Sequence, residues 1–166
     1  MSVPTYLVAR NEARVYVRTN GLANMKNAPL LDAFLREEMA TPVDIVCIDL
    51  SGCSGMDSTF MGLLVGTAGM LAAAGGKLVV VNPSDATHRL LGMLGVTEVV
   101  PVVLGCDLPD LEFVALEGHA ASGQVARMEV IHRAHRALVA LNEPNRQKFT
   151  AFLTALEADL AKHRAS

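Results

Sequence analysis

The sequence predicts a mixed α/β domain with a single sheet of four to five strands, helices packed mainly on one face, and a C-terminal helical hairpin. First, apolar runs typical of buried strands occur at 43–50, 77–82 and 98–103. Second, helix-like patterns lie between these runs, which favours parallel strands joined by right-handed crossovers. Third, the pattern changes after about residue 104, where two helical patterns follow one another.

Composition limits the class of protein. A chain of 166 residues, 51% of them apolar, is long enough for one domain with its own core and an appendage. The net charge of −3 offers no basic surface for nucleic acid or an anionic membrane. Cys47, Cys53 and Cys106 are odd in number and have no CxxC spacing, which is typical of a reducing compartment. Because the N-terminal residues do not have a secretion-signal pattern, we expect a cytoplasmic protein.

The N-terminal part predicts two strands and a helix. The strands are expected at 5–9 and 13–19, joined by a turn at Asn11 and Glu12. A helix from about 24 to 39 follows, with an amphipathic pattern. Its apolar stripe comprises Leu30, Leu31, Phe34, Leu35 and Met39.

The sheet is expected to continue with a strand at 77–82, a short helix at 84–94 and a last strand at 98–103. Pro101 cannot donate a hydrogen bond to a neighbouring strand, which places this last strand at an edge. We therefore expect an α/β domain over residues 1–103.

The rest of the chain is expected to form a linker at 104–119, in which 111–116 could be a short strand, and a helical hairpin over 120–166. The hairpin would contain a helix at 124–141 and a second helix that starts near Pro144. The apolar stripe of the second helix comprises Phe149, Leu153, Leu156 and Leu160. Because such a stripe is usually an interface, we expect the hairpin to form a homodimer or to pack on the open face of the sheet.

The most informative stretch begins where the apolar run at 43–50 ends. Gly52 and Gly55 are expected to form a tight loop, and Asp57-Ser58-Thr59 supplies three good N-cap residues for a long helix. The N–H groups and dipole at a helix N-terminus favour negative charge, including a phosphate on a hydroxyl. This order predicts an exposed Ser58 hydroxyl at the helix N-terminus, although capping alone also explains a serine there.

The central helix raises the question of a membrane span. No charged residue occurs between Ser58 and Gly76, and Gly62 and Gly66 form a GxxxG pattern. A span needs about 20 mainly apolar residues, whereas this segment is rich in Gly, Ser and Thr. We therefore expect a central helix packed closely on the sheet, and no membrane.

Enzymatic and metal-binding interpretations have weaker support. Neither GxxxxGK[ST] nor GxGxxG occurs, and a hydrolase would need a histidine brought to Ser58. His132 and His135 could share a helix face and bind a metal with His119 or Cys106 as remote ligands, but interface or solvated histidines are commoner. We expect no enzyme activity, no metal and no cofactor.

The stretch from Val43 to Leu64 resembles the STAS domain of bacterial anti-sigma factor antagonists. In that family a strand and a small loop precede Asp-Ser-(Ser/Thr)-Gly-Leu-Gly, which opens a helix. The similarity continues at 27–30, 77–82 and 90–96, and it covers residues 5 to about 103. Phe60 departs from the pattern, because the family usually has glycine there.

The resemblance implies a phosphorylatable, protein-binding switch in transcription regulation. In the family, the first serine after the aspartate is phosphorylated by a partner that is both serine kinase and anti-sigma factor, and a PP2C-type phosphatase removes the phosphate. Ser58 matches that serine. The implied partner-binding residues are Gly55, Met56, Asp57, Ser58, Thr59 and Met61. The alternative is a STAS scaffold or accessory subunit of a signalling or transport complex, with an inert serine.

Overall fold

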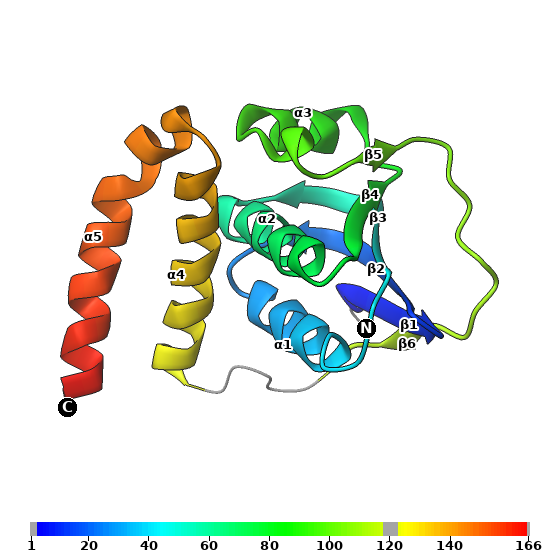
Figure 1. The fold of residues 1–166 in the computed structure, drawn as a ribbon, viewed down its shortest axis with the longest axis horizontal. Coiled ribbons are helices and arrows are strands. Elements are labelled where there is room, and N and C mark those ends of the chain that lie inside the picture. Colours follow the sequence, from blue (N-terminus) through cyan, green and yellow to red (C-terminus); the bar gives the residue numbers. More distant parts are fainter. Residues whose placement is uncertain (1–2, 118–122, 166) are drawn as a thin grey trace.

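The computed structural model describes residues 3–117 and 123–165, which form a six-stranded mixed sheet with helices against it and a helical hairpin beside it (Figure 1). The strands are β1 (Tyr6–Asn11), β2 (Arg14–Ala23), β3 (Ile45–Met56), β4 (Lys77–Val81), β5 (Val102–Val103) and β6 (Val114–Ala115). The helices are α1 (Ala28–Glu38), α2 (Ser58–Ala73), α3 (Asp85–Met93), the 3-10 turn η1 (Val96–Glu98), α4 (Gln124–Leu141) and α5 (Glu143–Ala165). The predicted mixed α/β class is confirmed, with two very short strands that bring the sheet to six.

The strand order is β5-β4-β3-β2-β1-β6. The strands β2, β3, β4 and β5 are parallel neighbours, whereas β1 pairs antiparallel with both β2 and β6. The short strand β6 lies within the segment 111–116 and pairs with the otherwise free edge of β1. Because β5 and β6 lie at opposite edges, the segment 104–113 between them spans the width of the sheet (Figure 1).

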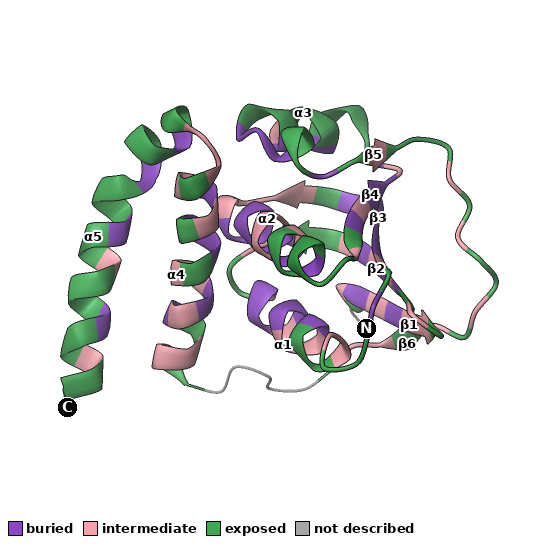
Figure 2. Cartoon of the chain, in the orientation of Figure 1, coloured by how far each residue is buried: buried purple, intermediate pink, exposed green. Residues whose placement is uncertain are grey.

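The main core lies between the sheet and the layer formed by α1 and α2. Alternate residues of the strands point into it, as expected for a sheet with one face buried by helices. Figure 2 shows buried residues along the strands and on the inward sides of these two helices. The fully buried side chains of this core include Val15, Val17, Ile48, Val80, Leu31, Phe60 and Leu64.

One expected loop and one expected strand differ in the structure. The strand β3 does not end in a tight loop but continues to Met56, because Gly52 lets β2 and β3 stay paired: a Cβ there would lie 3.1 Å from the carbonyl oxygen of Thr19. The predicted last strand at 98–103 is reduced to β5, because the chain after Gly95, at a φ of 78°, first forms η1. The predicted edge position of that strand is confirmed.

The C-terminal hairpin packs on the helix layer, not on the open face of the sheet. The helix α4 has the predicted bounds, and it contacts α2 on one side and α5 on the other. Leu138 of α4 and Phe149 of α5 join the main core. The expected packing on the open face is therefore wrong, because the apolar side of α4 meets α2 instead; a homodimer stays a prediction.

Candidate functional site

Asp57, and not Ser58, caps the central helix. One oxygen of its carboxylate accepts a hydrogen bond from the backbone N–H of Phe60 at 3.0 Å, which is the usual N-cap geometry. The other oxygen accepts from the N–H of Met25 at 2.8 Å. One side chain thus fixes both the start of α2 and the loop that leads into α1.

Ser58, the first residue of α2, faces a histidine from the hairpin. Its Oγ lies 2.8 Å from Nε2 of His135 on α4. The other ring nitrogen, Nδ1, lies 2.8 Å from the carbonyl oxygen of Ile131. Because a carbonyl only accepts, Nδ1 carries the proton and Nε2 accepts the hydroxyl hydrogen of Ser58. The expectation of an exposed hydroxyl is wrong, since Ser58 is half-buried beneath α4.

The imidazole of His135 is enclosed and neutral. The residue is only 4% exposed, and its ring contacts those of Phe149 and Phe152 at centroid distances of 5.2 and 4.7 Å. Burial lowers the pKa of His135 below its ordinary value, and the hydrogen bond to Ile131 and the charge of Asp57 only partly oppose this. A neutral ring is therefore buried against the hydroxyl of Ser58.

Glycines on α2 let α4 approach this closely. A Cβ on Gly62 would lie 2.5 Å from the carbonyl carbon of Ala134 and 2.9 Å from its Cα, so no side chain fits there. One turn on, a Cβ on Gly66 would make an ordinary contact of 3.7 Å with the Cβ of Ala137. The GxxxG pattern thus serves helix–helix contact with α4. The expected packing of the central helix on the sheet is confirmed, but it is made by the apolar side chains of α2 and not by these two glycines.

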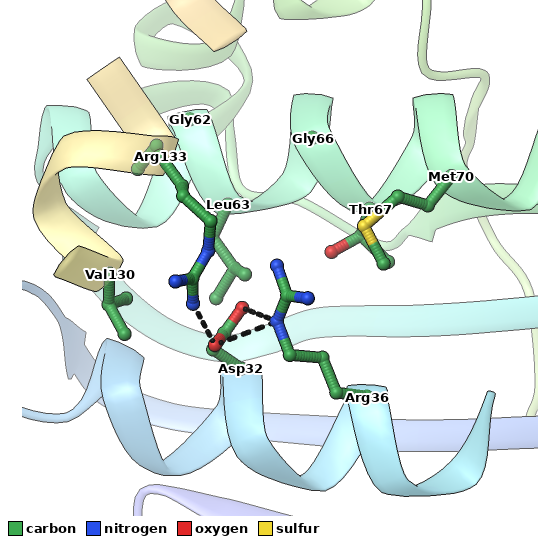
Figure 3. Close-up of a pocket in the computed structure, with 10 residues that line it drawn as sticks. Asp32, Arg36, Gly62, Leu63, Gly66, Thr67, Met70, Val130 and Arg133 are labelled. Atoms are coloured by element: carbon green, nitrogen blue, oxygen red, sulfur yellow. Dashed lines mark hydrogen bonds and ion pairs between the residues drawn. The ribbon is translucent and has the colours of Figure 1, made fainter. Parts of the chain in front are cut away.

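A buried carboxylate joins the hairpin to the domain. Asp32 on α1 accepts a hydrogen bond from Arg133 of α4 at 2.8 Å and also pairs with Arg36 of its own helix at 3.2 Å (Figure 3). Both guanidinium groups converge on this carboxylate at a small cavity of about 120 Å³ between α1, α2 and α4. Arg133 thereby links α4 to α1.

A second polar contact lies where α4 turns into α5. The side-chain amides of Asn142 and Asn145 donate to the carbonyl oxygen of Leu94, at 3.3 and 2.9 Å. Asn145 is almost fully buried, and its amide makes the shorter of the two hydrogen bonds to this carbonyl. The hairpin is therefore held at Leu94, at Asp32 and at Ser58.

The serine–histidine pair does not have the surroundings of a catalytic dyad. His135 is oriented by a backbone carbonyl on its own helix, and phenyl rings pack against it. None of the five cavities described among residues 3–117 and 123–165 is lined by Ser58 or His135.

The proposed metal ligands are not brought together. His132 pairs with Glu157 of α5 at 3.1 Å, whereas His135 turns to Ser58. His119 lies outside the described residues. Within the described parts of the chain, no group of three His, Cys, Asp or Glu side chains is placed to hold a metal ion.

The open face of the sheet carries a separate polar cavity of about 570 Å³. Asn82, at a φ of 56°, exchanges two hydrogen bonds with the backbone of Cys106 and so holds the segment 104–113 over it. Asp49 accepts hydrogen bonds from the backbone N–H and the hydroxyl of Ser51. Burial, with smaller contributions from Cys106 and Asp49, raises the pKa of the neighbouring Cys47 thiol to about 12.

The residues expected to bind a partner share the end of β3 and the start of α2, but their exposure differs. Gly55, Met56, Asp57 and Ser58 are half-buried, while Thr59 and Met61 are buried. Their role in partner binding stays a prediction. His135 was missed as a neighbour of Ser58, because 77 residues separate the two and no local pattern pairs them.

These features define an α/β module whose central helix opens with a capping aspartate and a serine. The chain belongs to the STAS domain family, whose family model matches residues 6–107. It is 31% identical over 99 residues to the anti-sigma-B factor antagonist of Bacillus subtilis strain 168, a match that covers 57% of this chain and 86% of the relative. The sequence resemblance is thus confirmed.

Solved structures agree with this assignment. The anti-sigma factor antagonist from Mycobacterium paratuberculosis is 26% identical, with a TM-score of 0.54 over 61% of this chain and 86% of that one. The anti-sigma factor antagonist SpoIIAA in its unphosphorylated form shares the fold, with 19% identity and a TM-score of 0.54 over 58% of this chain and 86% of that one. The family model ends before α4, so the hairpin lies outside it. No helix in the described ranges is long and apolar enough to cross a membrane.

Proposed function

We propose that this protein is a phosphorylatable protein-binding switch of the anti-sigma factor antagonist type, with Ser58 as the phosphate acceptor. In its unphosphorylated form it binds an anti-sigma factor that is also a serine kinase, and phosphorylation releases it. A PP2C-type phosphatase resets the switch. The chain acts by binding and not by catalysis.

The position of Ser58 carries this proposal. It is the first residue of α2 and directly follows the cap Asp57, in a chain that belongs to the STAS family. A phosphate adds about −1.5 to −2 charges at pH 7. Beside the carboxylate of Asp57, this phosphate makes the surface at the start of α2 more negative for any partner that docks there. The relative SpoIIAA has structures in both unphosphorylated and phosphorylated forms.

Binding to a candidate partner tests the switch. The test uses a histidine-kinase-like ATPase from the same organism, chosen first among the products of neighbouring genes, and measures its binding by isothermal titration calorimetry. We expect Ser58→Ala to bind at least as tightly as the wild type and Ser58→Glu to bind about tenfold or more weakly, since like charges brought together at an interface cost several kcal/mol. Equal affinities of the two variants would contradict the switch.

The second candidate function is a STAS scaffold whose serine is never modified. The hydrogen bond between Ser58 and His135 favours it, because the hydroxyl is engaged inside the chain and covered by α4. A phosphate on Ser58 in the native protein separates the two functions.

A further inference from the structure

The hairpin lies over the part of α2 on which the proposed switch depends. Its first helix, α4, contacts α2 from the Ser58 hydroxyl through Gly62 to Gly66. The family model ends at residue 107, so this cover is an addition to the STAS domain. A partner that binds at the start of α2 is therefore obstructed by α4.

A phosphate on Ser58 does not fit beneath α4. A phosphoryl group replaces the hydrogen that Oγ donates to Nε2 of His135, and at 2.8 Å no such group fits between these two atoms. The groups beside the hydroxyl are a neutral imidazole, the carboxylate of Asp57, and the phenyl rings packed against the imidazole. None of these side chains offers a positive charge, so a phosphate held beneath α4 would depend on the N–H groups and dipole at the start of α2 alone.

Departure of α4 uncovers the apolar contacts of Leu138 and Phe149 with the core, but the remaining polar contacts allow it without unfolding the sheet. Arg133 is 43% exposed in its side chain and reaches Asp32 from the rim of the interface (Figure 3). Asp32 keeps its ion pair with Arg36 when Arg133 departs, so its carboxylate is not left alone. Asn142 and Asn145 hold the far end of the hairpin at Leu94, where they can act as the pivot.

We propose that the α4–α5 hairpin is an autoinhibitory cap on the STAS domain, and that its closure over Ser58 excludes both phosphorylation of Ser58 and docking of a partner on α2. This inference rests on the proposed function, whose site it regulates. In the closed form, with α4 on α2, the protein does not bind its partner. The fraction of molecules in the open form, with α4 away from α2, sets the apparent affinity for the partner. A phosphate on Ser58 traps the open form.

A disulfide across the interface measures closure directly. The Cβ positions of residues 66 and 137 are 3.7 Å apart, within the range of about 3.5–4.5 Å found in disulfides. The variant Gly66→Cys/Ala137→Cys, made with Cys106→Ser to remove a partly exposed thiol, is equilibrated with reduced and oxidised glutathione. The equilibrium constant for forming the bond reports how often α4 lies on α2.

The constant is then compared between Ser58→Ala and Ser58→Glu in this background. Both substitutions remove the hydroxyl, so their difference isolates the added size and charge. We expect the glutamate to lower the constant by about tenfold or more relative to alanine. The matched control Ser54→Glu adds the same charge at an exposed position near the end of β3 and should leave the constant within about twofold of the parent.

Equal constants for the alanine and glutamate variants would overturn the cap, as would a Ser54→Glu effect as large as that of Ser58→Glu. Circular dichroism of each variant verifies that the sheet is folded, so a lost disulfide is not confused with unfolding. The equilibrium needs no partner and no kinase. Equal disulfide constants would contradict the cap but not the phosphorylation switch. An unmodified Ser58 in the native protein would contradict the switch but would not change the measured closure.

Discussion

Replacing Gly62 by alanine tests how the hairpin is held against the domain. The added methyl would clash with the carbonyl oxygen of Ala134 and lie 2.5 Å from its carbonyl carbon, whereas ordinary contacts begin at 3.4 Å, so α4 must move by at least roughly 0.9 Å. The obstacle is backbone, which cannot rotate away as a side chain would. Overpacking of this kind costs about 1–3 kcal/mol, and displacement of α4 also strains the hydrogen bond between Ser58 and His135.

The same helix supplies the matched controls. A methyl on Gly69 meets nothing within 4 Å, and one on Gly66 makes an ordinary contact of 3.7 Å. Both controls should gain up to about 1 kcal/mol from better helix propensity. In urea unfolding followed by circular dichroism, Gly62→Ala should be about 1–3 kcal/mol less stable than Gly69→Ala. Hydrogen exchange should show α4 less protected in Gly62→Ala. Equal stability and equal α4 protection in the two variants would refute the close packing.

Three further predictions follow from the site. Asp57→Ala should lower the free energy of unfolding by about 1–2 kcal/mol, because the carboxylate caps α2 and also binds the N–H of Met25; an unchanged urea midpoint would disprove the cap. His135→Ala should cost about 2–4 kcal/mol as a buried, hydrogen-bonded ring is lost, while His132→Ala, which removes only a surface pair, should cost less than about 1 kcal/mol; similar losses would contradict the pairing with Ser58. Burial lowers the pKa of His135, so between its native pKa and its ordinary value of 6.5 the unfolded chain binds the extra proton. The contribution of His135 to the free energy of unfolding should therefore be fully present above pH 6.5 and decline as the pH falls. When unfolding is measured from pH 8 to 5, this decline should be smaller in His135→Gln.

Local patterns in the sequence were sufficient for most of the fold. The helical periodicity at 124–141 predicted α4 with the observed bounds, and Pro101 correctly placed the last strand at an edge. The strand–cap–helix order around Ser58 identified the start of α2. These features depend on neighbouring residues, whose spacing encodes burial and capping directly.

The position of the hairpin could not be predicted in the same way. An apolar stripe indicates that a helix is covered but not by which surface, and both α2 and the open face of the sheet were available. The decisive contact is the close approach of the backbone at Ala134 to Gly62, which has no side chain. This role of Gly62 can be recognised only once Ala134 is known to lie opposite. The same limit hid the partner of His135, since its spacing from His132 was compatible with an interface or solvated histidine but did not indicate which residue lies opposite.

The central claim is that Ser58 carries a phosphate that switches binding. Mass spectrometry of the protein isolated from its native host tests it most directly, by locating phosphate on the peptide that contains Asp57, Ser58 and Thr59. We predict a singly phosphorylated form with the phosphate on Ser58 and no such form in Ser58→Ala. Unmodified Ser58 under all growth conditions, or phosphate on Thr59 alone, would contradict the switch and favour the scaffold.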